Sequence, residues 1–135
     1  MSGGILDTKL MGMLEKALDL STRRHQLISA NIANVDTPGY RTKDIDFAAA
    51  LKQASDSPES QTLGSLLGLN SGSDQLKQDP EVIETQGLAI RNDGNNVNGD
   101  REMANLAENS LQYTLATQLL GREFSLIRSA IREGR

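Results

Sequence analysis

The chain has 135 residues, a formal net charge of -4 at pH 7, 3% aromatic residues and no cysteine or tryptophan. This length suits one domain with a modest core, and the scarcity of aromatic rings leaves leucine, isoleucine and alanine to bury most of the apolar surface. The negative charge argues against nucleic acid or an anionic membrane surface as a partner, and a chain without cysteine has no disulfide, thiolate nucleophile or zinc–thiolate site.

The first predicted element is a long helix from about Ile5 to Asn34. The residues at its start lack the basic segment and unbroken apolar run of a cleaved secretory signal, and no apolar run approaches membrane-spanning length. Arg24 falls on the apolar stripe of this helix, where the seam fades. Met11-Gly12 and the cluster from Ser21 to Arg24 lower the helix propensity, so we expect a helix that needs a partner to stay formed. The stripe follows spacings of three and four residues: Leu6, Leu10, Met13, Ala17, Leu20 and Leu27.

A sharp turn follows this helix. Pro38 lacks an amide hydrogen and pushes the preceding residue toward extended geometry, so the helix must end at or just before Val35. Thr37 to Tyr40 fits a type II turn with Gly39 at the third position, where φ must be positive. Gly39 is therefore predicted to be a backbone requirement.

Asn31 and Asn34 lie three residues apart on one face of the last helical turn. In one interpretation Asn34 caps the helix end and Asn31 is hydrated. In the other, both amides hold the turn or a neighbouring chain in register, as single polar residues do in helix seams. The residues alone leave both interpretations open.

The middle of the chain predicts little regular structure. An extended stretch runs through 41–47, and Asp46 is placed to cap a short helix over 48–52. Residues 53–78 are rich in serine, glycine, aspartate and glutamine and predict a long loop or flexible insert. Short β-rich runs within 80–97, broken by glycine and asparagine, predict one small hairpin.

The clearest pattern covers Asp100 to Glu133, a long helix that Asp100 is placed to cap. A heptad seam runs along it through Met103, Leu106, Ser110, Tyr113, Thr117, Leu120, Phe124, Ile127 and Ile131. A second apolar stripe lies beside this seam and comprises Leu111, Leu115, Leu119, Leu126 and Ala130. One helix can cover one stripe, so the other should stay exposed for a further partner.

These elements predict a mainly α fold: an antiparallel pair of long N- and C-terminal coiled-coil helices with a small irregular or β-hairpin middle region. Residues 1–40 and 100–135 would form one core domain, and 41–99 a middle region that contains the flexible insert 53–78. We expect self-association or a helical partner. The predicted helix seam and subunit interface comprises Leu10, Met13, Leu20, Leu27, Leu106, Leu111, Tyr113, Leu115, Leu119, Leu120, Phe124, Leu126, Ile127 and Ile131.

The sequence carries no convincing catalytic, cofactor or metal site. His25 is the only histidine and lies beside two arginines, so it is interpreted as a surface residue. Residues 68–72 only faintly resemble a nucleophile elbow, with the serine one place too late. The loop 93–100 lacks the spacing of a calcium loop and is better explained as a turn that feeds a helix cap. The chain is therefore predicted not to be an enzyme.

Ser29 to Tyr40, followed by Asp44-Ile45-Asp46-Phe47, resembles the amino-terminal signature of bacterial flagellar axial proteins, the rod and hook family. The signature turn comprises Asn31, Asn34, Thr37, Pro38, Gly39 and Tyr40. The short length, Asp93 to Val97 and the ending Ile131 to Arg135 resemble a proximal-rod member. Residues 110–116 lack the Arg-x-Tyr-x-x-Asn motif that other rod and hook members usually carry, which favours the same assignment.

This resemblance implies a structural subunit that assembles by helical packing into the hollow flagellar rod, which transmits torque and conducts exported subunits. It implies location in the periplasmic part of the basal body and export through the flagellar type III channel without a cleaved signal. Implied partners are copies of itself, other rod proteins, and proteins of the membrane-ring junction and export gate, with no nucleic acid, small-molecule substrate or cofactor. The alternative is a soluble helical adaptor or export chaperone that binds amphipathic helices.

Overall fold

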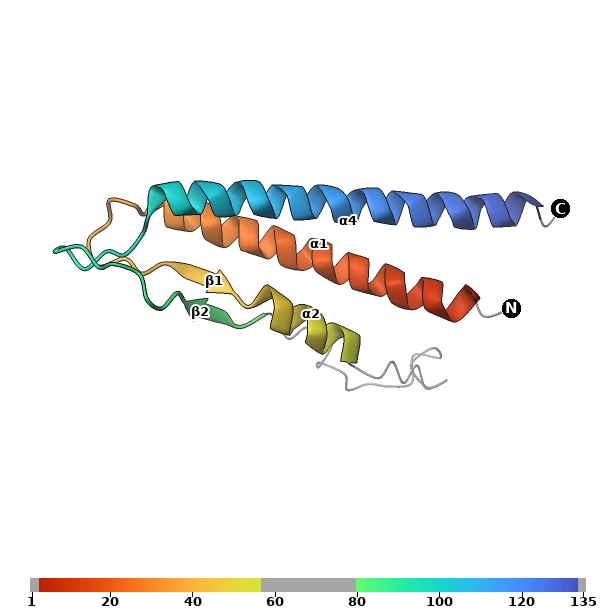
Figure 1. Cartoon of the computed structure of the whole chain (residues 1–135), viewed down its shortest axis with the longest axis horizontal. Helices are drawn as coiled ribbons and strands as arrows, with labels where there is room; N and C mark the ends of the chain where they lie inside the picture. Colours follow the sequence, from red (N-terminus) through yellow and green to blue (C-terminus); the bar gives the residue numbers. More distant parts are fainter. Residues whose placement is uncertain (1–2, 57–79, 134–135) are drawn as a thin grey trace, which may run out of the picture.

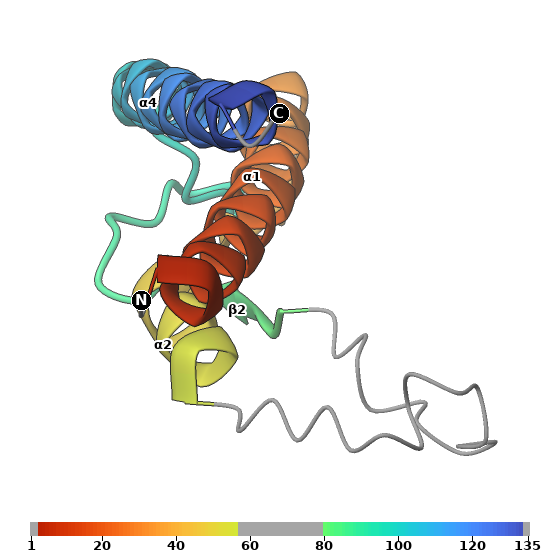
Figure 2. The ribbon, with the colours of Figure 1, turned by 90° about the vertical axis from the view of Figure 1, so that its right-hand side faces the viewer.

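Five elements follow one another in a computed structural model that describes residues 3–56 and 80–133. They are α1 (Gly3–Ala33), β1 (Lys43–Ile45), α2 (Phe47–Asp56), β2 (Val82–Glu84) and α4 (Gly99–Glu133). The two long helices run in opposite directions, and α1 lies between α4 and the layer formed by α2 and the strands (Figure 1). Figure 2 shows that the long helices cross at an angle. The predicted mainly helical fold, with paired terminal helices and a small two-stranded middle, is confirmed.

Helix α1 ends at Ala33, before Val35, as the proline predicts. The Asn34 amide still donates to the Ala30 carbonyl at 3.1 Å, and the side-chain amide of Asn34 donates to the same oxygen at 2.8 Å. Tyr40 N then donates to the Thr37 carbonyl at 3.3 Å, and Gly39 has a φ of 74°. The chain therefore reverses where the Pro-Gly pair directs it.

Helix α2 is longer than the 48–52 helix that the sequence predicts. Asp46 caps it as expected, because its Oδ1 accepts a hydrogen bond from Ala49 N at 2.9 Å. The helix continues to Asp56, so the first four residues assigned to the loop 53–78 are helical. The remainder of that predicted loop lies outside the described residues.

The small sheet is antiparallel, but the hairpin predicted within 80–97 is wrong. Strand β2 pairs with β1 in the register Lys43↔Glu84, Asp44↔Ile83 and Ile45↔Val82. Residues 88–91 form no strand. Because a lone hairpin is marginal in water, β2 gains more by pairing with a strand that α1 already supports through the buried Ile45.

Helix α4 is capped by an earlier residue than predicted. Asn98 accepts a hydrogen bond through Oδ1 from Arg101 N at 3.1 Å, so Asn98 and not Asp100 is the N-cap. The residues of α4 that are buried are Glu102, Asn109 and Ala116. The fully buried positions of α4 are therefore polar or small, and the predicted seam residues Leu106, Leu120 and Ile127 are half-buried beside them. The apolar stripe that was expected to be covered is thus covered only in part.

Candidate functional site

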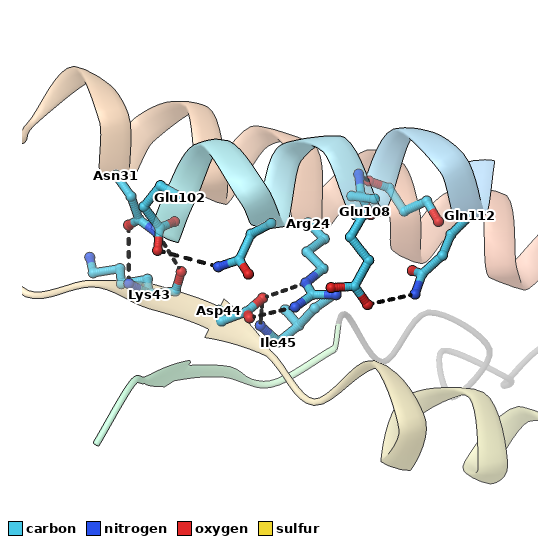
Figure 3. Close-up of polar contacts among 11 residues, drawn as sticks. Arg24, Asn31, Lys43, Asp44, Ile45, Glu102, Glu108 and Gln112 are labelled. Atoms are coloured by element: carbon cyan, nitrogen blue, oxygen red, sulfur yellow. Dashed lines mark hydrogen bonds and ion pairs between the residues drawn. The ribbon is translucent and has the colours of Figure 1, made fainter. Parts of the chain in front are cut away.

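A buried polar junction joins the end of α1 to β1, and Asn31 is its centre (Figure 3). The Asn31 side chain is 1% exposed. Its Nδ2 donates to the Lys43 carbonyl at 2.8 Å, and its Oδ1 accepts from Lys43 N at 3.1 Å. A side-chain amide that bonds both backbone groups of one strand residue takes the place of a neighbouring strand. Asn31 thereby fixes where the chain lies after the turn.

The same amide also connects α1 to α4. Asn31 Nδ2 donates to Glu102 Oε2 at 2.9 Å, and the Tyr40 hydroxyl donates to Asn31 Oδ1 at 3.2 Å. Glu102 is 1% exposed and also accepts from Asn105 at 3.4 Å. The pKa of Tyr40 is raised above its usual value of 10, mainly because burial desolvates the phenol and also because Glu102 repels a phenolate.

The structure separates the two asparagines of the signature. Asn31 is buried and holds the turn and strand in register, so the interpretation of Asn31 as simply hydrated is wrong. Asn34 caps the helix, as the first interpretation held, because its side chain bonds the Ala30 carbonyl and accepts from Thr37 Oγ1 at 3.1 Å. Each interpretation was right for one residue.

An ion pair also joins β1 to α1, about two helical turns before Asn31 (Figure 3). Arg24 Nε lies 3.0 Å from Asp44 Oδ1, and Arg24 Nη2 lies 3.0 Å from Asp44 Oδ2, a two-point contact. Asp44 Oδ1 also accepts from Ile45 N at 2.8 Å. The arginine that interrupts the apolar stripe of α1 therefore has a partner in the second half of the signature.

A second loop completes the junction, and sequence analysis missed its role. Asn95 is fully buried, and its Nδ2 lies 2.8–3.2 Å from the carbonyls of Asn34, Val35 and Thr37. Asn96 Oδ1 accepts from Thr42 N at 2.7 Å. The asparagine- and glycine-rich run 93–99 was the available signal, because such runs form turns with side chains that bond backbone groups.

The two turns also meet backbone to backbone. Gly39 N donates to the Asp93 carbonyl at 2.8 Å. Gly94 has a φ of 82°, and a Cβ at this position would lie 3.4 Å from the Cα of Gly39. Two glycines with positive φ therefore lie where the two loops meet.

Helix α4 carries two apolar stripes on opposite flanks of its covered face, and most of their side chains are exposed. Successive residues of an α-helix are about 100° apart, which places one flank through Leu111, Leu115, Leu119 and Leu126. The other flank comprises Met103, Leu106, Tyr113, Leu120, Phe124 and Ile131. Exposure reaches 61% for Leu111 and 68% for Ile131. We call these the leucine flank and the aromatic flank.

The predicted seam residues of α1 have different environments. Leu20 is buried, Met13 and Leu27 are half-buried, and Leu10 is exposed. On α4, Leu106, Leu120 and Ile127 are half-buried, whereas the other predicted seam residues are exposed: Leu111, Tyr113, Leu115, Leu119, Phe124, Leu126 and Ile131. An apolar surface of this length along one helix is typical of protein–protein contact.

Within the described ranges 3–56 and 80–133, acidic residues, histidine and cysteine form no cluster of three or more that could hold a metal ion. None of the helices in these ranges combines the length and the hydropathy needed to cross a membrane. The distinctive features of this part of the chain are thus a structural junction and two exposed helical flanks.

Comparison with known proteins identifies relatives over nearly the whole chain. A family model described as "Flagella basal body rod protein" matches residues 15–41, the second half of α1 and the signature turn. The flagellar basal body rod protein FlgB of Yersinia enterocolitica is 34% identical over 134 residues, which cover 93% of this chain and 98% of the relative. FlgB of Salmonella typhimurium is 35% identical, with 89% and 91% covered. FlgB of Borrelia hermsii is 29% identical, with 89% and 93% covered.

Proposed function

The chain belongs to the FlgB family of flagellar basal body rod proteins, structural components that are not enzymes, and from this we propose that it builds the proximal rod by packing both flanks of α4 against neighbouring subunits. The exposure of apolar side chains on two opposite flanks of one helix supports the proposal. Family membership also displaces the alternative of a soluble adaptor or export chaperone.

The arrangement of the two flanks favours an open assembly. The leucine flank and the aromatic flank differ in sequence, so a contact between the leucine flank of one subunit and the aromatic flank of the next is heterologous. Each subunit of such a pair keeps its other flank free for a further subunit. Such contacts propagate around an axis and give either a ring or a helical tube. A tube would account for a shaft that transmits torque.

The placement of the other elements relative to α4 supports a particular orientation of the subunit within that tube. Helices α1 and α2 and the small sheet all lie on one side of α4 (Figure 1). More space exists at larger radius, so this side would face outward and the opposite face of α4 would face the bore. That face carries small hydroxyl residues whose hydroxyls bond carbonyls of their own helix, among them Thr114 and Ser125, and Arg132 lies on it one heptad after Ser125.

The remaining details follow from this proposal. The partners would be copies of this chain, other rod proteins, and the proteins at the membrane-ring junction and export gate. The periplasmic part of the basal body would be reached by flagellar export without cleavage of a signal. The domain division into a core of 1–40 and 100–135 and a middle region of 41–99 would place the helices in the tube wall and the middle region outside it.

The experiment is complementation of a strain that lacks this chain. Leu115 is 51% exposed on the leucine flank, so Leu115→Asp should leave the free chain folded and abolish filament assembly and swimming. The matched control is Leu115→Met, which keeps the apolar surface and should restore both. Full swimming with Leu115→Asp at normal protein levels would refute the role of this flank.

A further inference from the structure

The face of α4 that meets α1 carries polar or small side chains at its most buried positions. The fully buried side chains of α4 are Glu102, Asn109 and Ala116, whereas no leucine of α4 is fully buried. Asn105 and Gln112 are half-buried, as are the apolar Leu106, Leu120 and Ile127. An amphipathic helix normally buries its apolar stripe. If burial alone decided, α4 would rotate about its own axis and place a flank against α1.

Two hydrogen bonds oppose this rotation, one in the first turn of α4 and one two turns later. Glu102 Oε2 accepts from Asn31 Nδ2 at 2.9 Å, and Asn109 Nδ2 donates to the Ser21 carbonyl at 2.9 Å. Asn109 is 2% exposed and Ser21 is 1% exposed, so the second bond lies in the interior of the helix pair. Both bonds form only when the polar face of α4 meets α1.

The same face contains acceptors without partners. Asn109 Oδ1 and Gln112 Oε1 are buried and have no hydrogen-bond partner within the described part of the chain. A buried acceptor without a partner lowers the net stabilisation that the face can give. The stability of the helix pair therefore does not explain why Asn109 faces α1. A role in fixing the rotational orientation of α4 does, because a single polar residue in a helix seam can specify one orientation.

We propose that Asn109, with Glu102, is a positioning residue that fixes the rotational setting of α4 and so keeps both apolar flanks outward for neighbouring subunits. The value of this setting for assembly rests on the proposed function. The setting itself belongs to the free chain and can be measured without any rod. The polar side chains on the covered face thus keep the two flanks exposed for assembly, and less apolar surface is buried within one subunit as a result.

The test uses single cysteines, which the natural chain lacks. Ala116→Cys probes the covered face, where Ala116 is 8% exposed, and Leu115→Cys and Tyr113→Cys probe the two flanks, where exposure is 51% and 45%. With Asn109 intact, the flank thiols should react with a thiol reagent about tenfold faster than the Ala116→Cys thiol, which needs local opening.

Asn109→Asp places a carboxylate against the Ser21 carbonyl and removes the donor. The variant should rotate α4, so that the Ala116→Cys thiol reacts about tenfold faster and one flank thiol becomes protected. Asn109→Ala tests loss of the bond without added charge and should shift the rates in the same direction. The matched control is Gln118→Glu, an exposed amide-to-acid change that should leave the rate ratio unchanged.

Unchanged ratios in both Asn109 variants, with helix content intact by circular dichroism, would overturn the proposal. Equal acceleration at all three thiols would overturn it as well, because the helices would then have separated and not rotated. Altered ratios in a variant that still swims normally would support the positioning role and count against the flanks as the assembly surface. The two proposals therefore fail through different results.

Discussion

The Asn31 side chain bonds both the carbonyl and the amide of Lys43, at 2.8 and 3.1 Å. Thr85 N donates to the Thr42 carbonyl across the sheet, so the next pair, Lys43 and Glu84, has its backbone groups pointing away from each other. The outward groups of Lys43 would have no partner in a two-stranded sheet. The Asn31 side chain bonds both groups, so a residue of α1 takes the position that a third strand would have.

Replacing Asn31 with alanine should therefore be strongly destabilising. The variant loses the two bonds to Lys43 and those to Glu102 and Tyr40, and buried groups remain without partners. We expect a loss of about 2–4 kcal/mol in the free energy of unfolding, measured by urea denaturation. Asn34→Ala is the matched control, because the Asn34 side chain makes only local bonds, to the Ala30 carbonyl and the Thr37 hydroxyl, and should cost about 1 kcal/mol. Equal costs would contradict the central role of Asn31.

The Arg24–Asp44 pair should contribute a measurable coupling energy. Its side chains are 15% and 24% exposed and the contact has two points, so it should exceed an ordinary surface pair. A double-mutant cycle with Arg24→Gln and Asp44→Asn should give a coupling of about 1–2 kcal/mol, reduced in high salt. A coupling near zero would mean that the remaining contacts of β1 hold it without this pair.

How much of this architecture the sequence predicts depends on whether the signal is local. The end of α1, the Pro-Gly turn, the Asp46 cap and the extent of α4 follow from residues close together in the chain, and the structure agrees with them. The partner of β2 and the buried face of α4 depend on contacts between residues far apart. No periodicity indicates that Asn109 would face α1 across 88 positions while leucines remain exposed.

The junction shows the same division. Gly39 is predicted from turn chemistry, but its contact with the loop at Asp93 needs two distant turns to meet. The role of Asn95 depends on three carbonyls in and next to the turn that follows α1, those of Asn34, Val35 and Thr37. Sequence analysis identified the end of α1 but did not identify Asn95 as the residue whose side chain bonds the carbonyls that follow it.

Two glycine-to-alanine substitutions should have opposite effects. Gly39 has a φ of 74°, where a Cβ is strained, so Gly39→Ala should lower the free energy of unfolding by about 1–2 kcal/mol. Gly121 lies in the interior of α4, and a Cβ added there would meet nothing within 4 Å, so Gly121→Ala should raise stability by about 0.5–1 kcal/mol. Thermal unfolding followed by circular dichroism measures both, and a shift of the same sign would refute the conformational argument.

Asn95→Asp should be among the most damaging isosteric changes in the chain. The Asn95 amide donates to carbonyls at the C-terminal end of α1, where the helix dipole is negative. A carboxylate there loses the donor and is repelled, so we expect a loss of about 3 kcal/mol at neutral pH. Protonation would remove the charge, so part of the loss should be recovered when urea denaturation is repeated near pH 4. Asn92→Asp is the exposed control and should have little effect.

Tyr40 should make the fold sensitive to alkali. Its pKa in the folded chain is raised by burial and by Glu102, so the unfolded chain releases this proton first. The contribution of the neutral phenol is fully present below about pH 10 and is lost as pH rises through the higher folded pKa. An ionised Tyr40 also has no proton to donate to Asn31 Oδ1. The measurement is urea denaturation from pH 8 to 11.5 in a Tyr113→Phe background, where Tyr40 is the only phenol and its absorbance can be titrated directly. Adding Tyr40→Phe should remove part of the alkaline loss of stability, and identical pH profiles with and without the phenol would show that Tyr40 is not its source.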